Sequence, residues 1–227
     1  MNGRFFNLKH ALAILGALLS FNALAINSGG GSSSTTKMIV GDSIFALSGE
    51  IHEFLEDDLN ESIDTYARSG CQMLGGNILC SSYYAIPRQY SRASKRGIET
   101  VIMNGGGNDF LLGDGADCGA PTSRACQEIL LEIEETLAGM FDDMRSDGID
   151  EIVFLGYYYL EDNDTNNEIN QISMDYKKAN YGAMGVKFVD TRADFLGNER
   201  RYITSDGIHP TSEGSRVLAN LIKQYLN

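Results

Sequence analysis

Short apolar runs alternate with longer stretches of helical periodicity along most of this chain, and this alternation restricts the fold more than any other feature. The expected strands are residues 37–40, 63–67, 99–104, 151–156 and 186–190. The expected helices are residues 44–59, 83–96, a long helix that begins near Thr122, 167–184 and 212–226. Strands separated by helices predict an α/β fold with a parallel sheet. Because the crossover connections are right-handed, the helices cover both faces of this sheet and form a three-layer α/β/α sandwich.

The long helix has an apolar stripe at helical spacing, which we expect to face the core. The stripe comprises Ala125, Ile129, Ile133, Leu137, Met140, Phe141 and Met144. In parallel sheets of this kind, ligands bind beyond the carboxyl ends of the strands. Polar residues that directly follow the expected strands are therefore the first candidates for a functional site.

The N-terminal residues have the pattern of a secretory signal peptide. Arg4 and Lys9 come first without an acidic residue, an apolar run follows over residues 11–24, and the run ends in an A-x-A motif. The alternative is an N-terminal membrane anchor, but the run is shorter than the roughly 20 residues that a spanning helix needs. We therefore expect residues 1–25 to be removed on export.

The rest of the chain divides into a flexible Gly/Ser-rich linker over residues 26–36 and one domain over residues 37–227. We expect this domain in the periplasm or outside the cell, without stable membrane insertion. The hydrophobic content of 43% excludes wholesale disorder. The 18 Lys and Arg stand against 31 Asp and Glu, a net charge of −13. Such a surface repels phosphates and anionic lipids, so nucleic-acid and membrane-surface partners are not expected.

Four cysteines lie in the part expected to be exported, namely Cys71, Cys80, Cys118 and Cys126. An even number in an oxidising compartment predicts two disulfides, and the sequence allows three pairings. We favour Cys71–Cys80 and Cys118–Cys126, because each closes a short loop. A zinc site is the competing interpretation, but the spacings do not match C-x-x-C ligand pairs.

The first polar cluster is Gly41-Asp42-Ser43, between the first expected strand and the first expected helix. A serine at a strand-to-helix turn exposes its hydroxyl at the sheet edge, and its backbone N–H faces the same cavity. This geometry suits a nucleophile. A helix N-cap alone would also explain an Asp or a Ser at this position.

The second cluster is the sequence GGGND at residues 105–109, after the third expected strand. Its glycines allow close approach of the backbone, and Asn108 offers an amide donor where negative charge could develop. The alternative is a phosphate-binding loop. The cluster lacks both the G-x-G-x-x-G order and the G-K-[ST] ending, and Asp109 would repel a phosphate.

The third cluster lies just before the last expected helix, where Gly207 and Pro210 fix a turn between Asp206 and His209. The Asp206 carboxylate can orient the His209 imidazole there and stabilise it when it takes a proton. The alternatives are an incidental histidine on a surface turn and a metal ligand. A metal site would need further ligands, and the only other histidine of the domain, His52, falls inside the first expected helix.

Together the three clusters resemble the sequence blocks of the SGNH (GDSL) hydrolase family, whereas the sequence has no G-x-S-x-G elbow of the kind found in most α/β-hydrolases. Gly-Asp-Ser follows the first strand, G-x-N-D stands at residues 106–109 and D-x-x-H at residues 206–209. Gly70 stands where the family has a glycine after the second strand, and Ile44 replaces the leucine of the family's name. The resemblance spans about residues 37–226 and implies a flavodoxin-like sandwich around five parallel strands.

The resemblance also implies a role for each residue. Ser43 would be the nucleophile, His209 the general base, and Asp206 the carboxylate that orients the imidazole. The oxyanion hole would consist of the backbone N–H groups of Ser43 and Gly70 with the side chain of Asn108. These roles predict a serine esterase that cleaves carboxylic esters through an acyl-enzyme and requires no metal or organic cofactor.

The sequence leaves the substrate class open among small-molecule, lipid and sugar esters. Carbohydrate O-acetylesterases and lysophospholipases use the same machinery, and a secreted binding module without catalysis is the alternative from another class. Residues 83–86 (YYAI) and 157–160 (YYYL) could line an apolar acyl pocket or could be core and rim aromatics. The oligomeric state is not predicted.

Overall fold

Three runs of residues that are buried at every position form the centre of the sheet: β1 (Lys37–Val40), β3 (Thr100–Met103) and β4 (Glu151–Leu155). The partly exposed strands β2 (Ile63–Thr65) and β5 (Val186–Val189) form its edges. The computed structural model describes residues 35–47, 49–161 and 163–226. Its five strands are parallel, in the order β2-β1-β3-β4-β5. The expected α/β/α fold class is confirmed.

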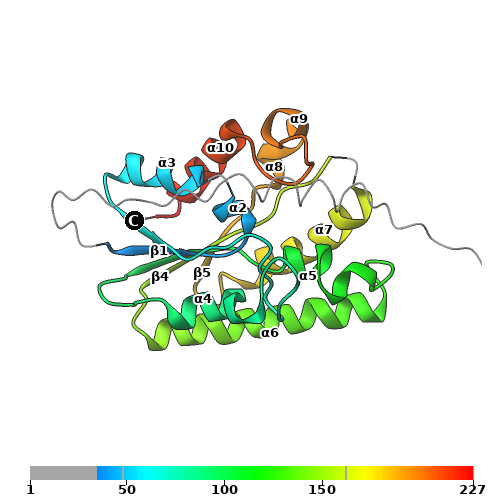
Figure 1. Ribbon diagram of the computed structural model, residues 1–227, viewed down its shortest axis with the longest axis horizontal. Helices are drawn as coiled ribbons and strands as arrows, with labels where there is room; N and C mark the ends of the chain where they lie inside the picture. Colours follow the sequence, from blue (N-terminus) through cyan, green and yellow to red (C-terminus); the bar gives the residue numbers. More distant parts are fainter. Residues whose placement is uncertain (1–34, 48, 162, 227) are drawn as a thin grey trace, which may run out of the picture.

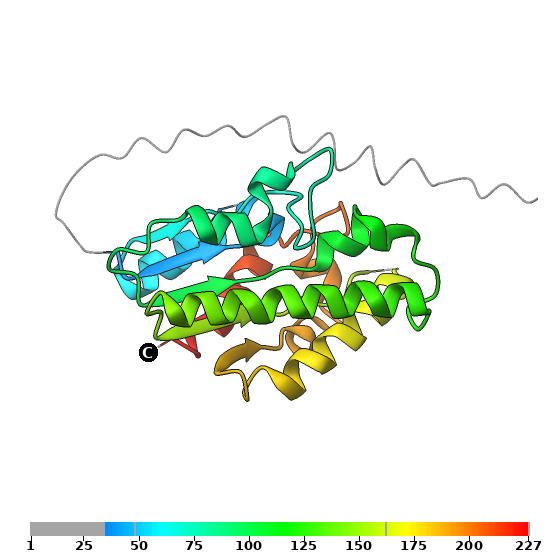
Figure 2. The ribbon, with the colours of Figure 1, turned by 90° about the horizontal axis from the view of Figure 1, so that it is seen from below.

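Strand side chains alternate between two hydrophobic layers, one on each face of the sheet (Figure 1). The helices of one layer are α4 (Ile86–Arg92), α6 (Arg124–Ser146) and α7 (Asp164–Asn180). The helices of the other layer are α2 (Ser43–Ala46), α3 (Glu50–Leu59), α8 (Arg192–Phe195) and α10 (Ser212–Lys223). Figure 2 shows α6 running along one face of the sheet between α4 and α7.

The connections contain short helices that the periodicity did not predict. They are the 3-10 turn η2 (Asp114–Asp117) and the helices α5 (Gly107–Leu111), α8 and α9 (Glu199–Tyr202). The 3-10 turn η1 (Ser82–Tyr84) lies at the start of an expected helix. The expected signal peptide and the linker up to residue 34 lie outside the described residues. Among the described helices, none is both long and apolar enough to cross a bilayer.

Two expected helices differ from the structure because the backbone turns within them. The first is divided into α2 and α3, since Gly49 has a φ of +71°, which favours glycine. The second, expected over residues 83–96, begins as a 3-10 turn and ends at Arg92, because Ala93 has an extended backbone.

The stripe of α6 also differs at its start. The helix is capped by Ser123, one residue beyond the expected position. From Ile133 onward the expected residues are buried, but Cys126 and Leu130 take the places of Ala125 and Ile129 in the first turns. Cys126, which is bonded to Cys118, is fully buried in the core, and Ile129 is partly buried against the same core.

Candidate active site

The five residues expected to form the site line one pocket, although they come from four separate segments. Ser43 is the first residue of α2 directly after β1, Gly70 lies in the loop after β2, and Asn108 lies in α5 after β3. Asp206 and His209 lie in the turn before α10. The carboxyl ends of the parallel strands thus bring the three sequence clusters together.

The Asp206 carboxylate holds the His209 ring in a fixed orientation. Asp206 Oδ2 lies 2.7 Å from His209 Nδ1, while Oδ1 accepts hydrogen bonds from Thr204 Oγ1 and from the backbone N–H groups of Ile208 and His209. Burial raises the pKa of Asp206, but the bonds from His209, Ile208 and Thr204 outweigh it and hold that pKa well below the usual range. His209 Nε2 is buried without a hydrogen-bond partner among the described residues, so it can accept a proton.

The turn that carries Ser43 is fixed by side chains from two other elements. Gln89 of α4 accepts a bond from the Gly41 N–H at 2.8 Å and donates one to the Gly41 carbonyl at 2.9 Å. Asn104 at the end of β3 accepts from the Asp42 N–H at 3.0 Å and donates to the Asp42 carboxylate at 2.8 Å. A Cβ atom at Gly41 would lie 2.0 Å from the Asn104 Oδ1, so only glycine fits here.

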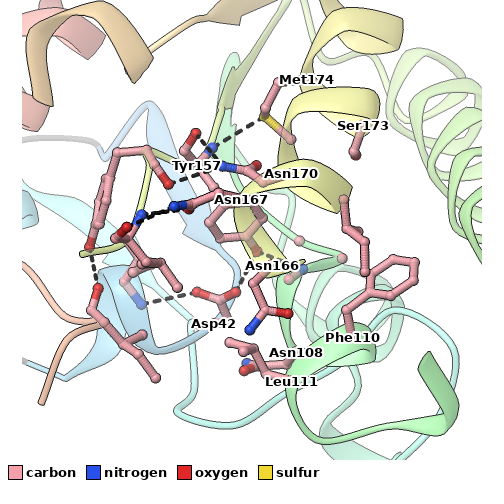
Figure 3. Close-up of a pocket in the computed structure, with 18 of the residues that line it drawn as sticks. Asp42, Asn108, Phe110, Leu111, Tyr157, Asn166, Asn167, Asn170, Ser173 and Met174 are labelled. Carbon is pink, nitrogen blue, oxygen red and sulfur yellow. Dashed lines mark hydrogen bonds between the residues drawn. The ribbon is translucent and has the colours of Figure 1, made fainter. Parts of the chain in front are cut away.

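The buried Asp42 carboxylate also binds Tyr157, which directly follows β4 (Figure 3). The Tyr157 hydroxyl donates to Asp42 Oδ2 at 2.5 Å and accepts from the Gly107 N–H at 3.2 Å. Burial raises the pKa of Asp42, while bonds from Tyr157, the Ile44 N–H and Asn104 oppose the rise. Burial and the nearby Asp42 charge raise the pKa of Tyr157 well above its ordinary value, so the phenol remains a donor.

The loop that contains Gly70 packs against α5. Gly70 has a φ of +74°, and a Cβ atom there would lie 2.7 Å from the Leu79 Cβ. The disulfide between Cys71 and Cys80 closes the loop, and Asn108 Nδ2 donates to the Cys71 carbonyl at 3.0 Å. Among the described residues, no acceptor binds the Gly70 N–H. The Gly70 N–H and the second N–H of the Asn108 amide are therefore available to a ligand.

Asp109, a residue of α5, anchors the loop that contains Gly70 to this helix. Its carboxylate accepts from the backbone N–H groups of Met73 and Leu74, each at 2.9 Å, and Gln72 Nε2 donates to the Asn108 carbonyl at 3.1 Å. Burial raises the pKa of Asp109 to about 6, against the effect of its two backbone donors. The fourth residue of the G-x-N-D block thus positions the loop.

The two disulfides are the local pairs favoured from the sequence, Cys71–Cys80 and Cys118–Cys126. They close loops of similar length, with sequence separations of 9 and 8 residues. Only the first flanks the candidate oxyanion residue Gly70.

A second, apolar cavity of about 80 Å³ adjoins the first pocket and shares Ser43 and Asn108 with it. Its apolar wall comprises Phe110, Leu111, Ile133, Tyr157, Tyr158, Leu160, Ile169 and Met174. Figure 3 shows Asn166 of α7 on the side of Asp42 and Asn108, whereas Asn167 and Asn170 bind the backbone of residues 157, 158 and 160. The segment 157–160 therefore lines a cavity, whereas Tyr83 and Tyr84 line a separate groove beyond the candidate site.

The sequence profile of the GDSL-like Lipase/Acylhydrolase family matches residues 39–217. The chain belongs to this family. The match covers the second half of β1, the other four strands and every residue of the candidate site, from Ser43 to His209. Family membership makes the chain a hydrolase of the esterase and lipase type.

Solved structures of such hydrolases share the fold. A lipase from a goat rumen metagenome has a TM-score of 0.66 at 18% identity, covering 85% of this chain and 97% of its own. An SGNH hydrolase from Slackia heliotrinireducens, described as putative, has a TM-score of 0.61 at 12% identity, with 85% and 99% covered. An acetylxylan esterase from Geobacillus stearothermophilus has a TM-score of 0.59 at 17% identity, with 85% and 94% covered. No curated protein sequence matches the chain significantly.

Three residues hold the site of this GDSL-like hydrolase in a role that was not expected from the sequence: Gln89, Asn104 and Tyr157, of which Tyr157 was expected only as a lining residue of an apolar pocket or a core or rim aromatic. Gln89 is a polar residue at a buried helical position, which is itself a signal. Asn104 and Tyr157 follow β3 and β4 at the edge where Ser43 lies, so the rule that selected the three clusters applies to them too.

We expect the two disulfides to differ in their effect on activity but not on stability. Replacing Cys71 and Cys80 by Ser, or Cys118 and Cys126 by Ser, should each lower the free energy of unfolding by roughly 2.5–3 kcal/mol, because the loops are of similar length. Only the first pair should slow ester hydrolysis, by less than the about 10²–10³-fold typical of a lost oxyanion donor. Denaturant unfolding and steady-state kinetics of both double variants measure this, and an equal loss of turnover in both would contradict it.

We expect Asp109 to give the stability a specific pH dependence. Its pKa is raised to about 6 in the folded chain, so its favourable contribution is complete below the unfolded value of about 3.9 and disappears as the pH rises through 6. Relative to Asp109→Asn, the wild type should lose on the order of 2–3 kcal/mol of unfolding free energy between pH 4 and pH 7. Urea unfolding of both proteins across this range tests it. If the unfolding free energies of the two proteins change in parallel with pH, the Asp109 carboxyl has an ordinary pKa and the prediction is wrong.

Proposed function

We propose that the chain is an exported serine esterase that hydrolyses carboxylic esters at Ser43. The observation that carries this proposal is the pocket in which Ser43, Gly70, Asn108, Asp206 and His209 meet. It contains a nucleophile, a base with a fixed orientation, and donors for a developing oxyanion. These are the components that acyl transfer by a serine requires.

In the proposed first step the Ser43 hydroxyl attacks the carbonyl carbon of the ester while His209 Nε2 takes the hydroxyl proton. The 2.7 Å contact between Asp206 and His209 Nδ1 supports this role, because it places the Nδ1 proton toward the carboxylate and leaves Nε2 as the acceptor. The Asp206 carboxylate stays ionised and stabilises the imidazolium that forms.

The carbonyl oxygen becomes an oxyanion in this step and needs preorganised donors. The N–H groups of Ser43 and Gly70 and the free amide N–H of Asn108 are the proposed donors. Asn108 is buried, and its bond to the Cys71 carbonyl fixes the amide plane before substrate binds. Such preorganisation is what makes an oxyanion hole effective, because no reorganisation is needed during the reaction.

The tetrahedral intermediate then collapses, the bond between the acyl carbon and the alcohol oxygen breaks, and His209 returns the proton to the leaving alcohol. A water molecule, deprotonated by His209, attacks the acyl-enzyme and releases the carboxylic acid and free Ser43. In these reaction steps every proton is transferred through His209, and the proposed mechanism requires no cofactor.

The apolar cavity next to Ser43 is the proposed acyl site. His209 lines the catalytic pocket but not this cavity, so the alcohol that must receive its proton belongs on the other side of Ser43. The cavity of about 80 Å³ has room for only a few non-hydrogen atoms, since one water needs roughly 10–15 Å³ on the same measure. Short acyl groups such as acetyl fit it better than long chains, as in the acetylxylan esterase of the same fold.

Export is supported by two independent features. The N-terminal sequence has the basic, apolar and A-x-A parts of a signal peptide, and two disulfides need an oxidising compartment. A non-catalytic secreted binding module is the competing proposal, and activity of the purified domain distinguishes the two.

We predict that Ser43→Ala abolishes both the hydrolysis of p-nitrophenyl acetate and labelling by a fluorophosphonate probe. The reason is that Ser43 Oγ is the atom that both reagents modify. Ser69→Ala is the matched control, since Ser69 lines the same pocket without a proposed role in the chemistry. Circular dichroism checks the fold of both variants. Labelling of Ser43→Ala at the wild-type rate would place the nucleophile elsewhere.

We predict that Asp206→Asn lowers kcat by up to about 10⁴-fold, the loss known for a serine protease triad, with little change in KM. The amide would favour the wrong tautomer of His209 and remove the charge that stabilises the imidazolium. The control is Asp190→Asn, because Arg192 lowers the pKa of Asp190 to about 2, yet this carboxylate does not line the pocket. Steady-state kinetics separates the cases. An equal kcat in the two variants would mean that Asp206 only shapes the turn.

A further inference from the structure

The charge of this chain is unevenly distributed along the sequence. The protein as a whole carries 31 acidic and 18 basic residues, yet residues 65–98 contain no Asp or Glu at all. The same segment contains the five cations Arg68, Arg88, Arg92, Lys95 and Arg96. A local excess of positive charge on a strongly acidic protein attracts anions to one place and leaves the rest of the surface repulsive to them.

These five cations also differ from the others in their ion pairing. Within residues 35–47, 49–161 and 163–226, every other Lys and Arg forms an ion pair with a carboxylate. Even the fully buried Lys177 pairs with Glu134. None of the five takes part in such a pair, although acidic residues are abundant. The chain itself thus supplies no counter-charge for them within the described ranges.

Three of these cations line one open groove, together with three tyrosines. The groove has a volume of about 910 Å³, which is within the range of small-molecule sites, and has no acidic residue in its wall. Arg68, Arg88 and Arg92 lie in this wall with Tyr83 and Tyr84. All three arginines and both tyrosines are exposed to solvent.

The groove adjoins the candidate active site. Ser69 and Leu79 line both the groove and the catalytic pocket, and Ser69 precedes the proposed oxyanion residue Gly70 in the chain. The buried Gln89 connects the two sites as well, because its amide donates to the carbonyls of both Gly41 and Tyr84. A ligand in the groove therefore lies next to the pocket of Ser43.

Two tyrosines stack on two of these arginines. Arg92 Nη1 also donates a hydrogen bond to the Tyr83 carbonyl at 3.0 Å, while the described residues supply no acceptor for the other guanidinium N–H groups of Arg68 and Arg92. The Arg68 guanidinium carbon lies 4.0 Å from the centroid of the Tyr84 ring, and that of Arg92 lies 3.0 Å from the centroid of Tyr83. Stacking of this kind fixes the plane of a guanidinium without using all five of its donors. A planar guanidinium with free edges binds carboxylates in a bidentate manner.

The direction of the reaction places the alcohol portion of the substrate in this groove. His209 must protonate the leaving oxygen, and it lines the catalytic pocket that Ser69 and Leu79 connect to the groove. The acyl group takes the apolar cavity on the other side of Ser43. The alcohol portion therefore extends past Ser69 toward the arginines.

We propose that the groove binds a carboxylated oligosaccharide as the alcohol portion of the ester, with Arg68, Arg88 and Arg92 determining this specificity. The inference rests on the proposed esterase function. The substrate class follows from the wall of the groove, which combines arginines for carboxylates with tyrosine rings and hydroxyl groups suited to sugars. A lipid chain would need a continuous apolar wall, whereas arginines, tyrosines and serines make up much of the wall of this groove.

The test compares an acetylated oligogalacturonate with an acetylated xylo-oligosaccharide of the same length. Wild-type kcat/KM should be at least about tenfold higher for the acidic substrate. Arg68→Gln and Arg88→Gln should each lower the ratio of acidic to neutral kcat/KM by about 10- to 100-fold, mainly through KM, as expected for a lost hydrogen bond to a charged group. Arg216→Gln is the matched control, because Arg216 is paired with Asp58 and lies outside the groove.

Binding provides a second measurement that does not depend on turnover. Calorimetric titration of the Ser43→Ala protein with oligogalacturonate should show binding that weakens in 0.5 M salt and in the Arg68→Gln background. Equal wild-type kcat/KM for the two sugars, or an unchanged ratio in both arginine variants, would overturn the inference. A preference for a lysophospholipid that the same variants abolish would assign the groove to a phosphate headgroup instead. Hydrolysis of p-nitrophenyl acetate separates the two proposals, since its absence in the wild type would refute the esterase function itself.

Discussion

The buried carboxylate of Asp42 joins the carboxyl ends of β1, β3 and β4 at the place where Ser43 lies. It accepts hydrogen bonds from the Ile44 N–H, from Asn104 after β3 and from Tyr157 after β4. Burying a carboxylate is unfavourable unless its lone pairs are satisfied, so these donors and the carboxylate depend on one another. The turn that presents Ser43 is therefore held from three strands of the sheet, and the adjoining loop of Gly70 is anchored to α5 through Asp109.

Much of the fold can be predicted from the sequence, because the hydrophobic pattern and the length of each apolar run are enough to locate buried parallel strands. The runs at β1, β3 and β4 are short, apolar and followed by Gly or Asn, so their positions are nearly those expected. Helix ends were harder to predict. The break at Gly49 depends on a left-handed backbone conformation, and the α6 stripe begins with Cys126 and Leu130 rather than with Ala125 and Ile129.

The residues of the candidate site also divide into those that could be predicted from the sequence and those that could not. Ser43, Asn108, Asp206 and His209 could be selected because each lies in a short block with its own chemistry, and Gly70 because of the family resemblance. The supporting residues Gln89, Asn104 and Tyr157 act through contacts between segments 48 to 115 residues apart, so their places in the chain make them candidates but only the folded chain shows their hydrogen-bond partners. The basic groove was also not apparent, since it depends on arginines from two segments and on the absence of ion pairs, which only the folded chain reveals.

The central claim is that the chain is preorganised to stabilise an oxyanion on Ser43. The most direct measurement is a crystal structure of the protein after reaction with a small alkyl phosphonate, whose phosphoryl oxygen takes the place of the oxyanion. The account predicts phosphorus bonded to Ser43 Oγ and the oxygen at about 2.7–3.1 Å from the backbone nitrogens of Ser43 and Gly70 and from Asn108 Nδ2. An adduct on another residue, or an oxygen that points away from Gly70 and Asn108, would contradict it.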